Sequence, residues 1–249
     1  MTALWALLLF FASAFALDAP MTIAIDAGHG GTDAGATRGG VREATVVLGI
    51  SQQLEKILNQ DPAYSAFLTR DSNSLLELQQ RVKKAKKNNA ELFVSIHANS
   101  SPDPHSQGME IYFRNELAPN EASLRLAHHE NQNEILKKKK TKGDVTSILN
   151  EMQKSMNTLK SYELSWHIVD HWKVPFSKKR MDTVKQGPFY VIQQDTIPSI
   201  LIEIGFITNE KEAKRLNTAS YQKEIAQAIY QGLKDYKETL DKGHSKALK

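Results

Sequence analysis

Short apolar runs alternate with longer amphipathic stretches along most of the chain. The runs have the length and composition of buried strands and fall at residues 21–25, 64–69, 91–96, 108–113, 189–193 and 199–204. Apolar positions at helical spacing lie at residues 43–59, 210–216 and 220–239. Strands that alternate with helices indicate an α/β fold. We therefore predict a single mixed β-sheet with helices packed on both faces.

One further helix is predicted from its start signal. Ser74 is followed three residues later by Glu77, which is the capping-box pattern of a helix N-terminus. This pattern places a helix between the second and third predicted strands.

The segment from residue 114 to residue 186 is longer than a connection between two strands needs. Long connections without secondary structure are rare inside domains, so we expect a helical insertion here. Leu124, Ala127, Asn131 and Ile135 indicate a short helix. A longer helix is indicated by an apolar stripe of six residues: Val145, Ile148, Leu149, Met152, Met156 and Leu159.

The first residues are typical of an export signal. An apolar stretch at residues 3–11 is followed by Ala14-Phe15-Ala16, which fits a cleavage site after Ala16. We expect residues 1–16 to be a signal peptide, residues 21–240 the catalytic domain and residues 241–249 a C-terminal tail. The protein would then be periplasmic or secreted, with no stable membrane insertion after cleavage. An uncleaved anchor and a buried first helix are the alternatives.

Net charge and cysteine content narrow the possible partners and compartment only slightly. The formal net charge of +4 is mild and suits attraction to an anionic cell wall. A nucleic-acid partner is not expected, because the chain shows neither aromatic platforms nor a basic recognition helix. Cysteine is absent, which does not decide the compartment.

Four ionisable residues stand at or just after apolar segments, or at a helix start. His29 lies in a glycine-rich loop after the first run, Glu43 opens the first helix, and His97 and Glu203 end two later runs. Each one alone has an ordinary structural explanation. Together, two imidazoles and a carboxylate with an open fourth position are typical of catalytic zinc, and a nearby carboxylate that is not a ligand is the usual base.

The segments around these four residues resemble the zinc-dependent N-acetylmuramoyl-L-alanine amidases of bacterial cell walls. The resemblance runs from about Thr22 to about Tyr236, and the four blocks occur in the family's order. It implies that His29, Glu43 and His97 bind Zn²⁺. It also implies that Glu203 is the general base in hydrolysis of the amide between N-acetylmuramic acid and L-alanine of peptidoglycan.

Three further residues are candidates for shaping the metal site. Asp26, Asp33 and Asn99 lie close in sequence to the histidines. Histidines that bind a metal usually donate their other ring proton to a carboxylate or carbonyl oxygen.

The resemblance also bears on the insertion. Some members of the family have a helix here that blocks the zinc site until an activator protein removes it, and Glu130 is the carboxylate that we expect to occupy the open position. The alternative is an ordinary packed helical segment that shapes the substrate groove.

Other motifs carry less weight. His167 and His171 have ligand-like spacing, but Ile168 replaces the glutamate of a zinc protease motif. Trp166 and Trp172 are more typical of core anchors than of sugar platforms. Two other functions stay open: a zinc peptidase, and a wall-binding regulatory protein with a silent site.

Overall fold

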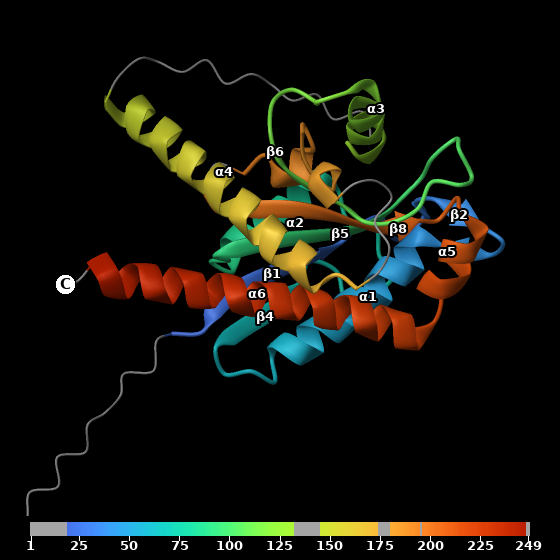
Figure 1. Ribbon diagram of the computed structural model, residues 1–249, viewed down its shortest axis with the longest axis horizontal. Helices are drawn as coiled ribbons and strands as arrows, with labels where there is room; N and C mark the ends of the chain where they lie inside the picture. The colour runs from blue at the N-terminus through green and yellow to red at the C-terminus, as the bar shows by residue number, and fades with distance from the viewer. Residues whose placement is uncertain (1–18, 132–144, 174–179, 195, 248–249) are drawn as a thin grey trace, which may run out of the picture.

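The computed structural model describes residues 19–131, 145–173, 180–194 and 196–247 (Figure 1). At its centre is a six-stranded sheet in the order β4-β1-β5-β8-β6-β7. The strands are β1 (Met21–Ala27), β4 (Tyr64–Leu68), β5 (Leu92–Asn99), β6 (Glu110–Arg114), β7 (Val184–Gly187) and β8 (Ser199–Phe206). A separate two-stranded ribbon pairs β2 (Thr37–Arg38) with β3 (Val41–Arg42).

The sheet is mixed, as predicted. Strands β4, β1, β5 and β8 are parallel, β6 is antiparallel to β8, and β7 is parallel to β6. Parallel strands bring their carboxyl ends to one edge of the sheet, where α/β proteins usually bind ligands. His97 and Glu203 lie within β5 and β8, a few residues before the strands end.

Three long helices cover one face of the sheet: α1 (Glu43–Leu58), α4 (Val145–His171) and α6 (Ala219–Ala247). Figure 1 shows α4 and α6 in front of the strands. Apolar side chains from alternate strand positions, such as Ile25, Val94 and Ile202, join Ile50, Ile168 and other helix residues in the main core. Burial of this surface is the main stabilising contribution to the fold.

The other face is covered by α2 (Leu78–Lys87), α3 (Glu121–Glu130) and the 3₁₀ turn η2 (Tyr190–Ile192). A smaller core on this side joins Phe93, Leu201 and Phe189 to residues of α2 and α3. The prediction of helices on both faces is therefore confirmed. The remaining elements are η1 (Arg180–Asp182) and α5 (Glu210–Leu216).

Two predicted elements are wrong. Residues 189–193 form the turn η2 instead of a strand, with Ile192 N–H donating to the Phe189 carbonyl oxygen. A short apolar run does not distinguish a buried strand from a helical turn. The helix predicted to start at Ser74 begins at Leu78, where Glu77 N–H donates to the Gln80 side chain at 2.9 Å.

Ser74 has another role, because residues before α2 lie against the glycine-rich loop after β1. A Cβ atom added at Gly30 would come within 2.2 Å of the Ser74 carbonyl oxygen. The Asn73 side chain accepts a hydrogen bond from Gly31 N–H at 3.1 Å. These contacts keep the backbone at Ser74 out of the helix.

The insertion contains two helices, α3 and α4, as predicted, although Ile135 of the first predicted helix lies outside the described residues. The predicted range of the insertion ends too late, because Val184–Gly187 form strand β7, which pairs with β6. The apolar stripe at the start of α4 is exposed, however, with 61% of Ile148, 60% of Met152 and 57% of Leu159 accessible. The second half of α4 is buried against α6 and the sheet through Leu164 and Ile168, and Trp172, just after the helix, joins the same core. The alternative of an ordinary packed helical segment therefore fits only the second half of α4.

The structure describes the segment near the C-terminus but not the one at the N-terminus. The expected signal peptide, residues 1–16, lies outside the described residues. Helix α6 continues to Ala247, so most of the segment expected to be a tail is helical; pairs such as Lys237 with Asp241 at 2.8 Å support its last turns. Among the described residues, no helix has both the length and the apolar character needed to cross a bilayer.

Candidate active site

The face of the sheet toward α2 and α3 carries a row of buried polar side chains. Side chains alternate between the two faces along a strand. This alternation puts Asp26 of β1, Ser95 and His97 of β5, Glu203 of β8 and Glu110 of β6 on this face, while their apolar neighbours in sequence join the main core. One face of the sheet thus carries the apolar side chains of the main core, and the other carries most of the buried ionisable side chains of the strands.

His29 reaches this row from the loop after β1. Its backbone has φ +55°, a conformation that non-glycine residues rarely adopt. A backbone bridge between Gly30 and Asp33 closes the loop, and Asp33 Oδ2 lies 2.8 Å from His29 Nδ1. The hydrogen bond from His29 lowers the pKa of Asp33 to about 2. The Asp33 contact turns the opposite ring nitrogen, Nε2, toward the row.

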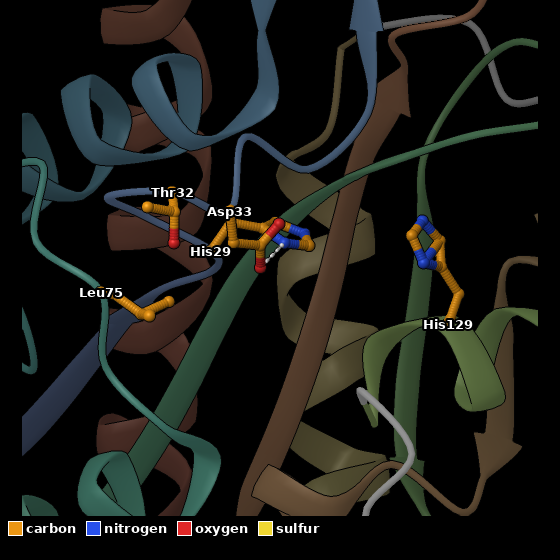
Figure 2. A pocket seen from close by; sticks show the side chains of 5 residues that line it. All are labelled: His29, Thr32, Asp33, Leu75 and His129. Atoms are coloured by element: carbon orange, nitrogen blue, oxygen red, sulfur yellow. Dashed lines mark hydrogen bonds and ion pairs between the residues drawn. The ribbon is translucent and has the colours of Figure 1, made fainter.

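A cavity of about 330 Å³ opens beside His29 (Figure 2). It is lined by His29, Thr32, Asp33, Leu75 and His129. His129 comes from α3, so the helix of the insertion forms one wall of the space in front of the site.

Glu43 enters from the first turn of α1 and is held by two backbone amides. Its Oε1 accepts a hydrogen bond from Ala98 N–H and its Oε2 one from Ala36 N–H, both at 2.8 Å. Burial by itself raises the pKa of Glu43, but His29 outweighs it and the pKa lies below its usual value. A side chain at Gly35 would come within 2.5 Å of Glu43 Oε2, so only glycine leaves room for this carboxylate.

Four side-chain atoms from distant parts of the chain meet here. Glu43 Oε1 lies 3.1 Å from His29 Nε2 and 3.3 Å from His97 Nδ1. Glu130 Oε2, from the last turn of α3, lies 3.3 Å and 3.0 Å from the same two nitrogens. The structure therefore brings together the three residues expected to bind zinc and the one expected to block the site.

The arrangement fits a metal ion. Ligand atoms of His29, His97 and Glu130 all lie within 4.8 Å of one another, and Glu43 Oε1 lies beside both histidines. Four ligands at about 2.0 Å from zinc are about 3.3 Å apart from one another, and the four distances between a histidine nitrogen and a carboxylate oxygen run from 3.0 to 3.3 Å. His29 Nε2, His97 Nδ1 and Glu130 Oε2 are buried without a hydrogen-bond partner. Buried polar atoms of native proteins normally have partners, so three such atoms close together fit the ligand set of a cation.

The electrostatics agree with a cation site. Burial by itself lowers the pKa of His97, but Glu130 outweighs it and the pKa rises to about 10. Burial by itself also lowers the pKa of His29. The Glu43 carboxylate acts in the opposite direction, and the net effect is a raised pKa. The two carboxylates thus stabilise positive charge, which protons or a metal ion can supply.

Glu203 lies beside this group. It pairs with His97 in the parallel register of β5 and β8, and it is fully buried. Among the residues that the structure describes, neither of its carboxylate oxygens has a hydrogen-bond partner. Burial raises the pKa of Glu203 well above its usual value, with the charge of His97 opposing the rise. A carboxyl group with a raised pKa can both accept and return a proton near neutral pH.

The three candidates for shaping the site have different partners. Asp33 contacts His29. Asp26 contacts no histidine side chain and binds Arg81 at 2.9 Å instead. Asn99 donates to Glu110 at 3.3 Å.

Sequence reasoning missed several residues of this face. Arg70 and Arg81 are almost fully buried and bind the loop of His29. Glu110, which pairs in register with Glu203, also binds Tyr112 and Lys185. A signal for Arg81 exists, because it falls on the buried side of α2 with Leu78 and Ala85.

The histidine pair and the two tryptophans, which were weaker candidates for function, contact other residues of the fold. His171 Nε2 lies 2.7 Å from Asp235 of α6, and the ring of His167 lies against Tyr236. Trp172 is buried in the main core, and the Arg180 guanidinium covers Trp166.

Comparisons with known proteins show the family of this chain. The profile of the family described as N-acetylmuramoyl-L-alanine amidase matches residues 23–235. A probable amidase AmiB of Haemophilus influenzae is 34% identical over 86% of this chain, which spans 52% of that relative. The amidase AmiA of Escherichia coli K12 is 34% identical over 90% of this chain and 79% of its own length.

A solved structure shows the same fold. The CwlD amidase of Clostridioides difficile, determined in complex with the GerS lipoprotein, is 26% identical with a TM-score of 0.65, covering 88% of this chain and 99% of that one. The chain spans about half the length of the first two relatives it matches, AmiB and the AmiC of Escherichia coli O6:H1. By the match over residues 23–235, this chain belongs to the N-acetylmuramoyl-L-alanine amidase family.

Proposed function

We propose that the protein is a zinc-dependent amidase that hydrolyses the bond between the lactyl group of N-acetylmuramic acid and L-alanine in peptidoglycan. The observation that carries this proposal is the convergence of His29, Glu43 and His97 beside Glu203, with Glu43 Oε1 3.1 Å from His29 Nε2 and 3.3 Å from His97 Nδ1. The family match supports the substrate class.

His29, Glu43 and His97 would hold the metal. Their side chains are nearly fully buried, and Asp33 and the amides of Ala36 and Ala98 orient two of them. A zinc ion held there supplies Lewis-acid chemistry, which polarises the substrate carbonyl and makes water acidic enough to react near neutral pH.

Glu203 moves the protons. Its carboxylate takes one proton from the attacking water, whose oxygen bonds to the lactyl carbonyl carbon. The same carboxyl group then gives the proton to the amide nitrogen as the carbon–nitrogen bond breaks. The products are a lactyl carboxylate and the free amino group of L-alanine. The absence of hydrogen-bond partners on Glu203 leaves both of its oxygens available for these transfers.

We also propose that the resting protein is autoinhibited by Glu130. Its carboxylate lies against both histidines, where substrate and water would enter. Asn131 anchors the end of α3: its Nδ2 donates to the Pro188 carbonyl oxygen at 2.9 Å, and its Oδ1 accepts from Tyr190 N–H at 2.7 Å. Opening the site would require α3 to leave this position.

A partner protein would drive that opening by binding the exposed stripe of α4, residues 148–159. Apolar side chains there are half or more exposed, and such exposed patches commonly mark protein interaction sites. α4 is the next helix after α3 in the chain, and binding of a partner to the stripe would draw α3 away from the site. The GerS complex of CwlD is a relative bound to another protein. The place of action would be the periplasm or the exterior.

The test combines metal analysis with digestion of purified sacculi. The parent should contain about one zinc per chain. Glu203→Gln should retain the zinc and lose several orders of magnitude in hydrolysis rate, whereas His29→Ala should lose the metal. Glu163→Gln, an exposed glutamate of α4, is the matched control and should leave both quantities unchanged.

The products distinguish the rival functions. An amidase releases stem peptides that begin with free L-alanine and leaves unsubstituted lactyl groups on the glycan. A zinc peptidase would cut within the stem peptides, and a silent wall-binding protein would bind sacculi without releasing either product. Full activity of Glu203→Gln would show that the assigned base is wrong.

A further inference from the structure

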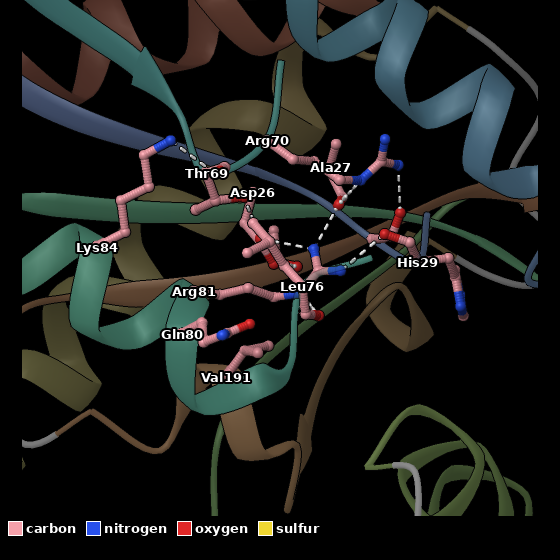
Figure 3. A network of polar contacts seen from close by, with 12 residues as sticks. Asp26, Ala27, His29, Thr69, Arg70, Leu76, Gln80, Arg81, Lys84 and Val191 are labelled. Atoms are coloured by element: carbon pink, nitrogen blue, oxygen red, sulfur yellow. Dashed lines mark hydrogen bonds and ion pairs between the residues drawn. The ribbon is translucent and has the colours of Figure 1, made fainter. Parts of the chain in front are cut away.

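The loop that carries His29 turns its backbone oxygens inward. The carbonyl oxygens of Ala27, Gly28 and His29, three consecutive residues, each accept hydrogen bonds from a buried guanidinium group. The donors are Arg70, just after β4, and Arg81 of α2, which are 2% and 1% exposed. Figure 3 shows the two side chains converging on the end of β1.

Arg81 fixes the loop from the side of α2. Its Nη1 donates to Asp26 Oδ1 at 2.9 Å and to the Ala27 carbonyl oxygen at 2.5 Å. Its Nη2 donates to the His29 carbonyl oxygen at 2.7 Å, and its Nε donates to the Leu76 carbonyl oxygen at 3.1 Å. One rigid guanidinium thus sets the distance between the strand that ends at Ala27 and the residue whose imidazole faces the metal position.

Arg70 links the same loop to the helix of Glu43. Its Nε donates to the Ala27 carbonyl oxygen at 2.8 Å, and its Nη2 donates to Gly28 at 2.6 Å and to Ala44 at 2.9 Å. Ala44 directly follows Glu43 in the first turn of α1. Arg70 therefore bridges the backbones of the two proposed ligand segments, together with the backbone hydrogen bonds from Glu43 N–H to Ala36 and from Ala44 N–H to Ala34.

Folding alone does not explain two arginines here. A buried cation is costly unless it is paired, and Asp26 is the one carboxylate in hydrogen-bond contact with either guanidinium among the described residues. His29 also adopts a positive φ. Such backbone conformations persist where the surroundings hold them, and they cluster at functional sites. Several fixed donors on three consecutive carbonyl oxygens provide that restraint.

We propose that Arg70 and Arg81 are positioning residues of the metal site, which hold the backbone of Ala27–His29 so that the His29 imidazole stays at ligand distance from Glu43. This inference rests on the proposed zinc function. A lysine keeps the positive charge but lacks the planar fork, so it cannot donate to several carbonyl oxygens at fixed angles. Replacement of either arginine by lysine therefore tests the hydrogen-bond geometry while the positive charge is kept.

The experiment measures zinc binding by Arg70→Lys and Arg81→Lys. Lys84→Met is the matched control: Lys84 lies on the same helix as Arg81 and donates to the Thr69 carbonyl oxygen at 2.8 Å, without touching the loop. For each metal-free protein the thermal midpoint is recorded. The zinc dissociation constant is then measured by competition with a chelator, and the absorption spectrum is recorded after loading with cobalt.

We expect both lysine variants to bind zinc about 10- to 100-fold more weakly than the parent, as is typical when groups behind metal ligands are changed. Their cobalt spectra should also change. Lys84→Met should keep the parent's zinc affinity and spectrum, even if its thermal midpoint falls. Parent-like zinc affinity and spectra in both lysine variants would overturn the inference, and so would an equal loss of affinity in Lys84→Met.

A second variant covers the case in which neither lysine protein folds. Asp26→Asn keeps the size of the side chain but removes the charge that Arg81 binds. A zinc dissociation constant several-fold above that of the parent supports the role of Arg81, and an unchanged constant refutes it. A parent that binds no zinc at all would instead refute the proposed function.

Discussion

The contact of Glu130 with the site predicts how replacement of this residue by alanine should act. In the resting structure the carboxylate lies 3.0 Å from His97 Nδ1 and 3.3 Å from His29 Nε2. Alanine removes both contacts and leaves the anchor at Asn131 and the buried Leu126 in place. The closed position of α3 should therefore become less stable, and the three proposed ligands should remain.

The size of the effect follows from these contacts. Removal of one partner from a buried ion pair typically costs about 3–5 kcal/mol, so loss of the Glu130 carboxylate from the two histidines should cost the closed state about 3 kcal/mol or more. Because about 1.4 kcal/mol changes an equilibrium constant tenfold, the ratio of open to closed molecules should rise by about 100-fold. If few parent molecules are open at rest, basal hydrolysis should rise by a similar factor, up to the limit at which every molecule is open.

The assay is the release of soluble fragments from dye-labelled sacculi by purified protein, with zinc content measured in parallel. Glu121→Ala is the matched control, because Glu121 lies at the exposed start of the same helix and pairs with Arg125 at 2.7 Å. It should leave the basal rate unchanged. If Glu130→Ala retains the metal and digests sacculi no faster than the parent, Glu130 does not inhibit the enzyme.

Three further predictions concern other parts of the fold. Gly232→Ala should destabilise the protein by about 1–3 kcal/mol in urea unfolding, because its Cβ would come within 2.6 Å of the α4 backbone; Gly243→Ala meets no atom within 4 Å and should be neutral or slightly stabilising. Burial raises the pKa of Asp26, but Arg81 outweighs it and the pKa is lowered. Stability from this group is therefore present above the unfolded value and is lost as the pH falls through the folded one, so in urea unfolding of metal-free protein Asp26→Asn should show a weaker loss of stability in acid; an equal loss would contradict the assignment. Met152→Asp on the exposed stripe of α4 should abolish amidase products in the sacculi of cells that depend on this enzyme, and addition of Glu130→Ala should restore them; no restoration would argue against displacement of α3 by a partner.

Much of the fold could be predicted from the sequence, because strands and helices buried on one side leave a clear periodicity. The strands that carry His97 and Glu203 were predicted in this way, and so was the helix that begins at Glu43. The turn at residues 189–193 was missed because its apolar residues are buried like those of a strand. The start of α2 was misplaced because the contact of Ser74 with Gly30 is not local in sequence.

The candidate site was predicted less evenly. His29 and His97 stand out at strand ends, but the partner of each side chain depends on strand order and register, which periodicity does not give. Glu130 lies in an unremarkable helix far along the chain, and only the family resemblance pointed to it. The role of Arg70 could not be predicted, because its acceptors are backbone oxygens, which any sequence offers.

The isolation of Glu203 has a consequence for the balance between stability and activity. A fully buried carboxyl group without a hydrogen-bond partner destabilises the folded state. If Glu203 is the general base, substitutions that relieve this burial should make the protein more stable and inactive, so selection for thermal stability alone would tend to remove the proposed base. The buried Glu203 carboxyl group thus lowers the free energy of unfolding. The large apolar core on the opposite face of the sheet offsets this loss of stability.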